Sequence, residues 1–357
     1  MFVKKEVGKM KSKNVAIVVA VIVIVVVVAA VALMMGGGPT GPAAGVPTEL
    51  KVGVILPGTV TDYGWDYAPL VALNKLETMD LPIRITSHKF VELVEPGDAE
   101  GAARDLVSVG YNWIWAWGFQ YREAILAVAS GTSQGVYFLI NEGKAADAIS
   151  GKVDVIDEFP HKTAYLLGII GGSMSRTKKV GVISGMETLH IVLGEAGFKA
   201  GAQAYDSSIT FDHIYVGGWA DPEGGRVAAE SLMAKGVDVI YCQGDGTSLG
   251  VIQAVKAARD AGKEVFYIGY PVDQSVLAPG YVLTSNVYDY SDILFSMIND
   301  IYTGNYGKGK YSIELGKGME MAPFYNFDTE IPQRAKDMVA KAREDILSGK
   351  LTVPTTL

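Results

Sequence analysis

Residues 50–67, LKVGVILPGTVTDYGWDY, decide the fold that this sequence predicts. Leu50–Leu56 is a short apolar run with β-branched residues, which is typical of a buried strand, and Pro57-Gly58 ends it. A loop follows, and helical spacing begins near Tyr67. In an open parallel α/β sheet such a loop leaves the carboxyl end of the first strand, where ligands bind. We therefore expect a strand, a ligand-binding loop and a helix.

The loop carries two carboxylates and two aromatic side chains, Asp62, Tyr63, Trp65 and Asp66. An indole face with hydrogen-bonding carboxylates beside it suits a flat, polar heterocycle. A surface turn with a half-buried tryptophan would contain the same residues. From this loop alone both interpretations stay open.

Strand-like and helical patterns alternate along the rest of the chain. Candidate strands cover 51–56, 83–90, 112–117, 136–140, 153–156, 179–183, 211–216, 237–242, 264–268 and 281–285. Helical patterns cover 66–79, 98–109, 120–130, 161–174, 191–205, 221–235, 247–261 and 289–303. This alternation predicts an α/β protein with parallel, doubly wound sheets. Residues 178–201 repeat the strand, loop and helix of residues 51–76, which suggests two similar lobes whose first loops face each other across a cleft.

Composition excludes several classes of function. The net charge is −8, and the one basic cluster, Lys4 to Lys13, precedes an apolar stretch, so nucleic-acid binding is not expected. The single cysteine, Cys242, lies in an apolar run and forms neither a disulfide framework nor a zinc motif. The four histidines show no metal-ligand spacing, and we predict no metal site and no cofactor.

The N-terminus predicts a membrane anchor. Val15–Met35 is 21 consecutive apolar residues, enough to cross a bilayer core of about 30 Å. Five lysines before it favour a cytoplasmic N-terminus, which places the rest of the chain outside the cell. The length of the apolar stretch favours an uncleaved signal anchor over a signal peptide cleaved near Ala30-Val31-Ala32. Cleavage of a pilin-like signal at Lys11-Ser12 is a third option. We expect a cytoplasmic segment at 1–13, a transmembrane helix at 14–35 and a Gly/Pro-rich linker at 36–48.

The segment Gly244–Gly250, GDGTSLG, follows a strand and opens a helix. It fails as a dinucleotide fingerprint and lacks the ending of a phosphate loop. It matches the nucleophile elbow GxSxG, but no histidine follows His213, so an α/β-hydrolase triad cannot form. The remaining interpretations are free backbone N–H groups that face a ligand, or plain capping by Asp245 or Thr247.

Three of the five tryptophans lie in NWIWAWGFQY, residues 112–121, and share one face of a strand. We expect Trp113 and Trp115 to pack in the core, and Gly118, Phe119 and Gln120 to be better ligand candidates. Two carboxylate pairs, Asp62 with Asp66 and Asp157 with Glu158, have no partner that assigns acid and base roles.

Several of these segments together resemble the basic membrane protein (BMP) family, the substrate-binding proteins of ABC importers typified by the purine nucleoside receptor. They are TDYGWDY (61–67), WGFQYREAI (117–125), KKVGVISGME (178–187), GEAGFKAG (194–201), GDGTSLGVIQAVKAA (244–258), DQSVLAPGYVLTS (273–285) and LSGKLTVP (347–354). The resemblance covers about residues 50–355 and implies a type I periplasmic-binding fold with two Rossmann-like lobes. It implies an N-terminal lobe of 49–158 with about 286–315 and a C-terminal lobe of 159–285 with about 316–357, joined by crossings near Phe159, Ser285 and Gly316.

The resemblance also implies roles for particular residues. Asp62 and Asp66 lie where the family has an Asp and an Asn, and Trp65 lies where it has an aromatic residue that stacks on the base. Gly118-Phe119 and Gly246-Thr247 match two further ligand-binding loops of the family.

Three departures from the family pattern concern the ribose and the second stacking ring. Pro271 stands where an Asp usually binds ribose, Tyr288 replaces a Lys, and Gly194 replaces a stacking Phe, while Tyr270 or Tyr288 offers a replacement aromatic. The predicted ligand-binding set is Asp62, Tyr63, Trp65, Asp66, Gly118, Phe119, Asp245, Gly246, Thr247, Tyr270, Asp273 and Tyr288.

We therefore expect an extracellular, membrane-anchored solute receptor that delivers a purine nucleoside or nucleobase to the permease and ATPase of an ABC importer. The nucleoside and the free base remain alternatives. A nucleoside-processing enzyme that uses Asp62 and Asp66, or a ligand sensor that signals through the single span, are the competing functions.

Overall fold

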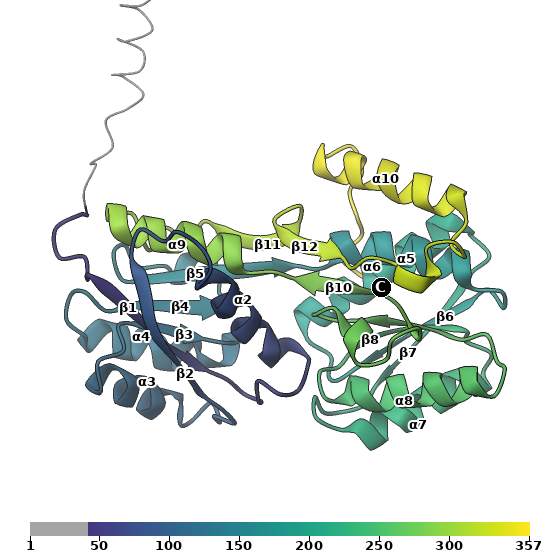
Figure 1. Ribbon diagram of the computed structural model, residues 1–357, viewed down its shortest axis with the longest axis horizontal. Helices are drawn as coiled ribbons and strands as arrows, with labels where there is room; N and C mark the ends of the chain where they lie inside the picture. The colour runs from purple at the N-terminus through teal and green to yellow at the C-terminus, as the bar shows by residue number, and fades with distance from the viewer. Residues whose placement is uncertain (1–41) are drawn as a thin grey trace, which may run out of the picture. The chain divides into compact units, whose positions relative to one another are not determined.

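The computed structural model describes residues 42–357, and residues 45–357 form one compact unit (Figure 1). The predicted cytoplasmic segment, the predicted transmembrane helix and residues 36–41 of the predicted linker lie outside the described residues. Among the helices from residue 42 onward, none has both the length and the apolar character needed to cross a membrane.

Strands and helices alternate as the sequence predicts. The strands are β1 (Glu49–Ile55), β2 (Arg84–Val91), β3 (Trp113–Ala116), β4 (Tyr137–Asn141), β5 (Val153–Phe159), β6 (Lys179–Ser184), β7 (Thr210–Tyr215), β8 (Val239–Gln243), β9 (Phe266–Gly269), β10 (Val282–Tyr288), β11 (Tyr311–Leu315) and β12 (Gly318–Met321). The α-helices are α2 (Ala68–Leu76), α3 (Ala99–Ser108), α4 (Arg122–Gly131), α5 (His161–Met174), α6 (Leu189–Tyr205), α7 (Pro222–Ala234), α8 (Thr247–Asp260), α9 (Ser291–Thr303) and α10 (Gln333–Leu347). The expected α/β class is confirmed, whereas β11, β12 and α10 were not predicted.

The twelve strands follow the order β2-β1-β3-β4-β5-β11-β12-β10-β9-β8-β6-β7. We call β1 to β5 the N-terminal half-sheet and β6 to β9 the C-terminal half-sheet; each is parallel throughout. Strand β10 changes partner between them. Val282–Ser285 pairs in parallel with β9, and Asn286–Tyr288 pairs antiparallel with β12. Strands β11 and β12 are short and bounded by glycines, which explains why the apolar pattern did not reveal them.

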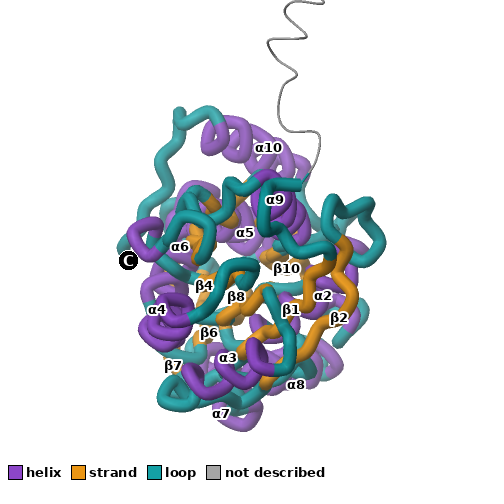
Figure 2. Tube along the Cα trace, turned by 90° about the vertical axis from the view of Figure 1, so that its left-hand side faces the viewer, coloured by secondary structure: helices purple, strands orange, loops and turns teal. Residues whose placement is uncertain are grey.

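Helices cover both faces of the strands (Figures 1 and 2). Helices α3, α7 and α8 lie along one face, and α5, α9 and α10 lie along the other. The apolar core is divided accordingly, with one cluster against α3 and α4, a second against α7 and α8, and a third that runs along the other face. This two-sided covering is the arrangement expected of parallel sheets.

Glycines allow α5 and α6 to pack closely. A Cβ atom on Gly168 would lie 2.1 Å from the carbonyl oxygen of Phe198, and one on Gly201 would lie 1.9 Å from that of Tyr165. Neither distance is compatible with a side chain at that position. Gly168 and Gly201 therefore let α6 pack closely against α5, which begins directly after β5.

Candidate functional site

The loop after β1 is the first part of the site. Asp62 Oδ1 accepts a hydrogen bond from the backbone N–H of Gly64 at 2.8 Å, which holds the loop in a tight turn. A short 3-10 helix, Trp65–Tyr67, leads from there into α2. Gly64 is required for close approach, because a Cβ atom there would lie 2.4 Å from the Cα atom of Asp245.

The loop after β8 supplies the second part. Asp245 has a positive φ of 25°, and its Oδ1 atom accepts a hydrogen bond from the backbone N–H of Trp65 at 2.7 Å. Gln274, fully buried, donates from Nε2 to the carbonyl oxygen of Tyr63 at 3.1 Å. These two bonds join loops that follow strands of different half-sheets.

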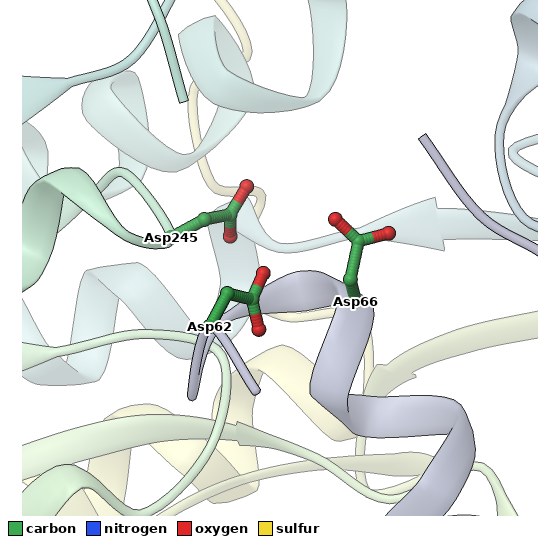
Figure 3. Close-up of side chains that lie close together, drawn as sticks. All are labelled: Asp62, Asp66 and Asp245. Atoms are coloured by element: carbon green, nitrogen blue, oxygen red, sulfur yellow. The ribbon is translucent and has the colours of Figure 1, made fainter. Parts of the chain in front are cut away.

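Three carboxylates meet where the loops join. Figure 3 shows that Asp62, Asp66 and Asp245 lie close together, and one oxygen of each lies within 4.8 Å of the others. We call these three residues the carboxylate trio. Asp66 and Asp245 are buried, at 5% and 7% exposure. Asp66 Oδ1 has no hydrogen-bond partner among the described residues.

Burial and mutual repulsion keep the trio from ionising fully at neutral pH. Burial, followed by the charges of Asp245 and Asp62, raises the pKa of Asp66 to about 9. Burial and the charge of Asp62 raise the pKa of Asp245 as well. Burial raises the pKa of Asp62 to about 6, although the hydrogen bond from the backbone N–H of Gly64 acts to lower it. Asp66 is therefore a protonated donor at neutral pH, and Asp62 is an acceptor.

A trio that contains both protonated and ionised carboxyl groups can bind both hydrogen-bond donors and acceptors on the edge of a ligand. A protonated carboxyl group donates one hydrogen bond, and an ionised one only accepts. Three carboxylate oxygens at this spacing are also a donor set that a hard cation takes when the groups are ionised. The raised pKa of Asp66 favours the hydrogen-bonding role.

An aromatic row extends from the trio. The ring of Trp65 lies 4.6 Å from that of Trp117, and Trp117 lies 5.0 Å from Tyr290, measured between centroids. Trp115 packs edge-on against both Trp117 and Tyr290. The indole Nε1 atoms of Trp65 and Trp117 are buried and have no partner among the described residues. We call Trp65, Trp117 and Tyr290 the aromatic row.

The structure brings some of the other predicted residues to this region. Tyr270 and Tyr288 are buried, and their rings meet edge-on at 5.2 Å. At Gly194, a side chain would lie 2.1 Å from Gln243 Oε1, so Gln243 fills the space that a Phe would need.

Other predicted residues are engaged elsewhere. Phe119 is 53% exposed, and Gly118 before it has a φ of 130°. Asp273 caps a short 3-10 helix by accepting from the N–H of Ser275, and it accepts a second hydrogen bond from the hydroxyl of Tyr325. The structure places neither Phe119 nor Asp273 in contact with the trio, and their binding roles stay predictions.

The interpretation of GDGTSLG as a source of N–H groups for a ligand stays a prediction, and two of its N–H groups are already engaged within the protein. The N–H of Thr247 donates to the carbonyl oxygen of Trp219, and that of Ser248 donates to Gly244 and Asp245. The Thr247 hydroxyl donates to the carbonyl oxygen of Gly218 at 3.1 Å. Asp245 is the residue that this segment contributes to the trio.

Sequence reasoning missed several residues of the region. The strand pattern groups Trp117 with Trp113 and Trp115, and it predicts ligand contacts at Gly118, Phe119 and Gln120 instead. Gln274 and Tyr290 carry no local signal, because their partners are distant in sequence. His190 was not distinguished from the other histidines, yet its Nδ1 lies 2.7 Å from Glu142 Oε1. Burial alone would lower the pKa of His190, but contacts with Asp157 and Glu142 outweigh burial and raise it to about 10.

The fold is that of a solute-binding protein of the periplasmic-binding type. It is similar to the crystal structure of an ABC transporter solute-binding protein from Aeropyrum pernix K1, with a TM-score of 0.74 and 18% identity over 85% of this chain and 94% of that chain. Residues 49–340 match the model of the Bmp family, described as ABC transporter substrate-binding protein, PnrA-like. The chain therefore belongs to this family of ABC transporter substrate-binding proteins, which confirms the resemblance noted from the sequence.

Curated relatives carry consistent names. Basic membrane protein A of Borreliella afzelii is 26% identical over 89% of this chain and 94% of its own length. The ABC transporter nucleoside-binding protein BmpA of Lactococcus lactis is 25% identical over 88% and 92%. A purine-binding protein of Brucella abortus is 28% identical over 87% and 85%.

Proposed function

We propose that this chain captures a purine nucleoside or nucleobase and delivers it to the permease of an ABC importer. The observation that carries the proposal is the partly exposed ring of Trp65 beside the trio, because a flat ring face and carboxyl groups of mixed protonation are what a purine requires. Trp117 and Tyr290 are fully buried and support this ring from within the protein. The names of the Lactococcus and Brucella relatives support the same ligand class.

The proposal includes capture between two lobes. The lobe boundaries remain those predicted from the sequence, and the change of partner in β10 between Ser285 and Asn286 supports the crossing proposed there. The bonds from Trp65 to Asp245 and from Gln274 to Tyr63 join loops of different half-sheets. In this account, closing the lobes over the ligand forms these bonds.

We also propose that the N-terminal apolar stretch anchors the chain in the cell membrane, with the binding unit outside. The 21 apolar residues and the preceding lysines support this part of the proposal. Protease treatment of intact cells tests it, since degradation of residues 45–357 is expected and complete protection would contradict it.

Ligand binding is testable through the tryptophans. Purine stacking on Trp65 should quench tryptophan fluorescence as the ligand is titrated into the full-length chain. Adenosine, guanosine and adenine are the ligands to compare, with ribose alone as a control. A change that saturates with a purine supports the proposal, and no change with any of them contradicts it.

The raised pKa of Asp66 is the one observation that favours a second function, nucleoside hydrolysis with Asp66 as a general acid. We propose binding without chemical change instead, in keeping with the family. Chromatography after prolonged incubation with adenosine distinguishes the two, because a receptor returns the nucleoside intact and a hydrolase releases adenine.

A further inference from the structure

An ion pair of His190 joins the two half-sheets. His190 lies in the first turn of α6, which follows β6 of the C-terminal half-sheet, and its Nδ1 atom lies 2.7 Å from Oε1 of Glu142. Glu142 follows β4 of the N-terminal half-sheet. The two side chains are only 11% and 12% exposed, so solvent screens their charges weakly. This pair therefore links the half-sheets at a second place, apart from the bond between Trp65 and Asp245.

Further carboxylates face His190 from the N-terminal half-sheet. The Nε2 atom of His190 lies 3.6 Å from Oδ1 of Asp157 in β5, and the charge of the buried Glu158 acts on the ring as well. Helix α5, which packs against α6, carries the cation Lys162, but Lys162 pairs with Glu314 of β11. The charges that His190 meets from the N-terminal half-sheet are therefore all negative.

The turn that holds Glu142 is fixed to the N-terminal half-sheet. Glu142 has a φ of 55°, in the left-handed region that a residue with a side chain rarely adopts unless its surroundings hold it there. The N–H of Gly143 donates to the carbonyl oxygen of Ile156 in β5 at 3.2 Å, and a Cβ atom on Gly143 would lie 2.8 Å from Val155. Glu142 should therefore move with β4 and β5, and not with His190, when the half-sheets separate.

The charge of His190 depends on these carboxylates. The N–H groups at a helix N-terminus carry partial positive charge and disfavour a cation there. Burial also disfavours the charge, yet the contacts with Asp157 and Glu142 raise the pKa of His190 to about 10. Away from those carboxylates, the pKa of His190 returns toward its ordinary value of about 6.5. At pH 8, His190 is therefore charged when the half-sheets are together and mostly neutral when they are apart.

We propose that His190 and Glu142 form a proton-dependent latch that stabilises the closed conformation. Closing brings the two side chains together and takes up a proton on His190, so proton and purine each strengthen the binding of the other. The pair stabilises the closed conformation with or without a ligand. The inference rests on the proposed function, because it requires capture between two lobes. It adds a form of regulation, since the chain should hold its ligand more tightly at neutral than at alkaline pH.

Calorimetric titration of the full-length chain with adenosine tests the latch. Titration at pH 8 in two buffers of different ionisation enthalpy counts the protons that are taken up as adenosine binds. We expect His190→Gln to take up about 0.5 to 1 proton fewer than the parent. From pH 7 to pH 9, the affinity of the parent should fall about 10- to 100-fold more than that of the variant, because one group contributes at most about tenfold per pH unit between its two pKa values.

The expected range allows for other groups that titrate. Burial raises the pKa of Glu158 to about 7 and the charge of His190 acts to lower it, so Glu158 takes back part of the lost proton in the variant. The carboxylate trio is present in both chains. His88→Gln is the matched control, because His88 in β2 lies 3.3 Å from Glu77 at the end of α2 and both belong to the N-terminal lobe. Its surroundings do not change on closing, and its proton uptake should equal that of the parent.

Each outcome decides the inference. Equal proton uptake by the parent and His190→Gln, with adenosine still bound, overturns the latch while purine binding stands. An equal loss in His88→Gln and His190→Gln also overturns it, because His88 joins no half-sheets. If His190→Gln does not fold, Glu142→Gln removes the partner instead and should take up fewer protons than the parent. If the parent binds no adenosine, the proposed function fails and the latch fails with it.

Discussion

Asp66→Asn is the sharpest perturbation of the carboxylate trio. Asn has nearly the shape of a protonated Asp, so the variant keeps a neutral side chain at every pH. In the parent, the pKa of Asp66 is raised from 3.8 to about 9 by burial and by the neighbouring carboxylates. The folded chain therefore retains a proton that the unfolded chain releases, and stability falls as pH rises from about 4 toward 9.

The size of the effect follows from linkage. One group loses at most about 1.4 kcal/mol of stability per pH unit between its two pKa values, which is at most about 4 kcal/mol from pH 5 to pH 8. The folded chain can relax by loosening the hydrogen bond between Trp65 and Asp245, which lowers the cost of ionising Asp66. We therefore expect the parent to lose about 1 to 4 kcal/mol of stability from pH 5 to pH 8, relative to Asp66→Asn.

Urea unfolding at pH 5, 6, 7 and 8 measures the difference. Asp80→Asn, at an exposed aspartate, is the matched control and should track the parent throughout. Titrating groups outside the trio cancel, because they are common to the parent and the variant. A stability difference between the parent and Asp66→Asn that stays constant with pH would refute the assignment of a retained proton to Asp66.

Three further predictions concern residues around the trio. Trp65→Ala should weaken purine binding by about 1–3 kcal/mol, the usual value of a base stacked on an aromatic ring, and unchanged affinity in calorimetry would place the ligand elsewhere. Gly64→Ala should lower affinity at least about tenfold, since its Cβ meets the backbone of Asp245, whereas Gly97→Ala, with open space around it, should not. His190→Gln should destabilise the chain by about 1–3 kcal/mol below pH 6.5, because the charged His190 loses its ion pair with Glu142. In urea unfolding, the stability difference from the parent should vanish as pH passes about 10, and a difference that stays constant with pH would rule out the ion pair.

The sequence predicted the elements whose patterns are local. Val52 and Val54 in β1, and Trp113 and Trp115 in β3, are buried as the apolar pattern and the core assignment indicated. The β11 strand contains no such run, and it is formed by pairing with β5, so only the tertiary structure reveals it. Pattern analysis finds elements that their own residues stabilise.

The candidate site divides in the same way. Asp62, Trp65 and Asp66 share one loop, and their proximity could be predicted from spacing alone. The contact of Trp65 with Asp245 spans 180 residues, and the bond between Tyr290 and Glu158 spans 132. Both depend on how the half-sheets are joined, which no single stretch of sequence encodes. Phe119 follows an aromatic strand, its side chain is 53% exposed, and its ligand contact stays a prediction.

The central claim is that this substrate-binding protein holds one purine between the ring of Trp65 and the carboxylate trio. Calorimetric titration of the refolded full-length chain, freed of carried-over ligand by unfolding, tests it most directly. The account predicts saturable binding of one adenosine or guanosine per chain and no binding of ribose alone. Absence of binding heat with every purine nucleoside and nucleobase, from a chain that unfolds cooperatively, would contradict it.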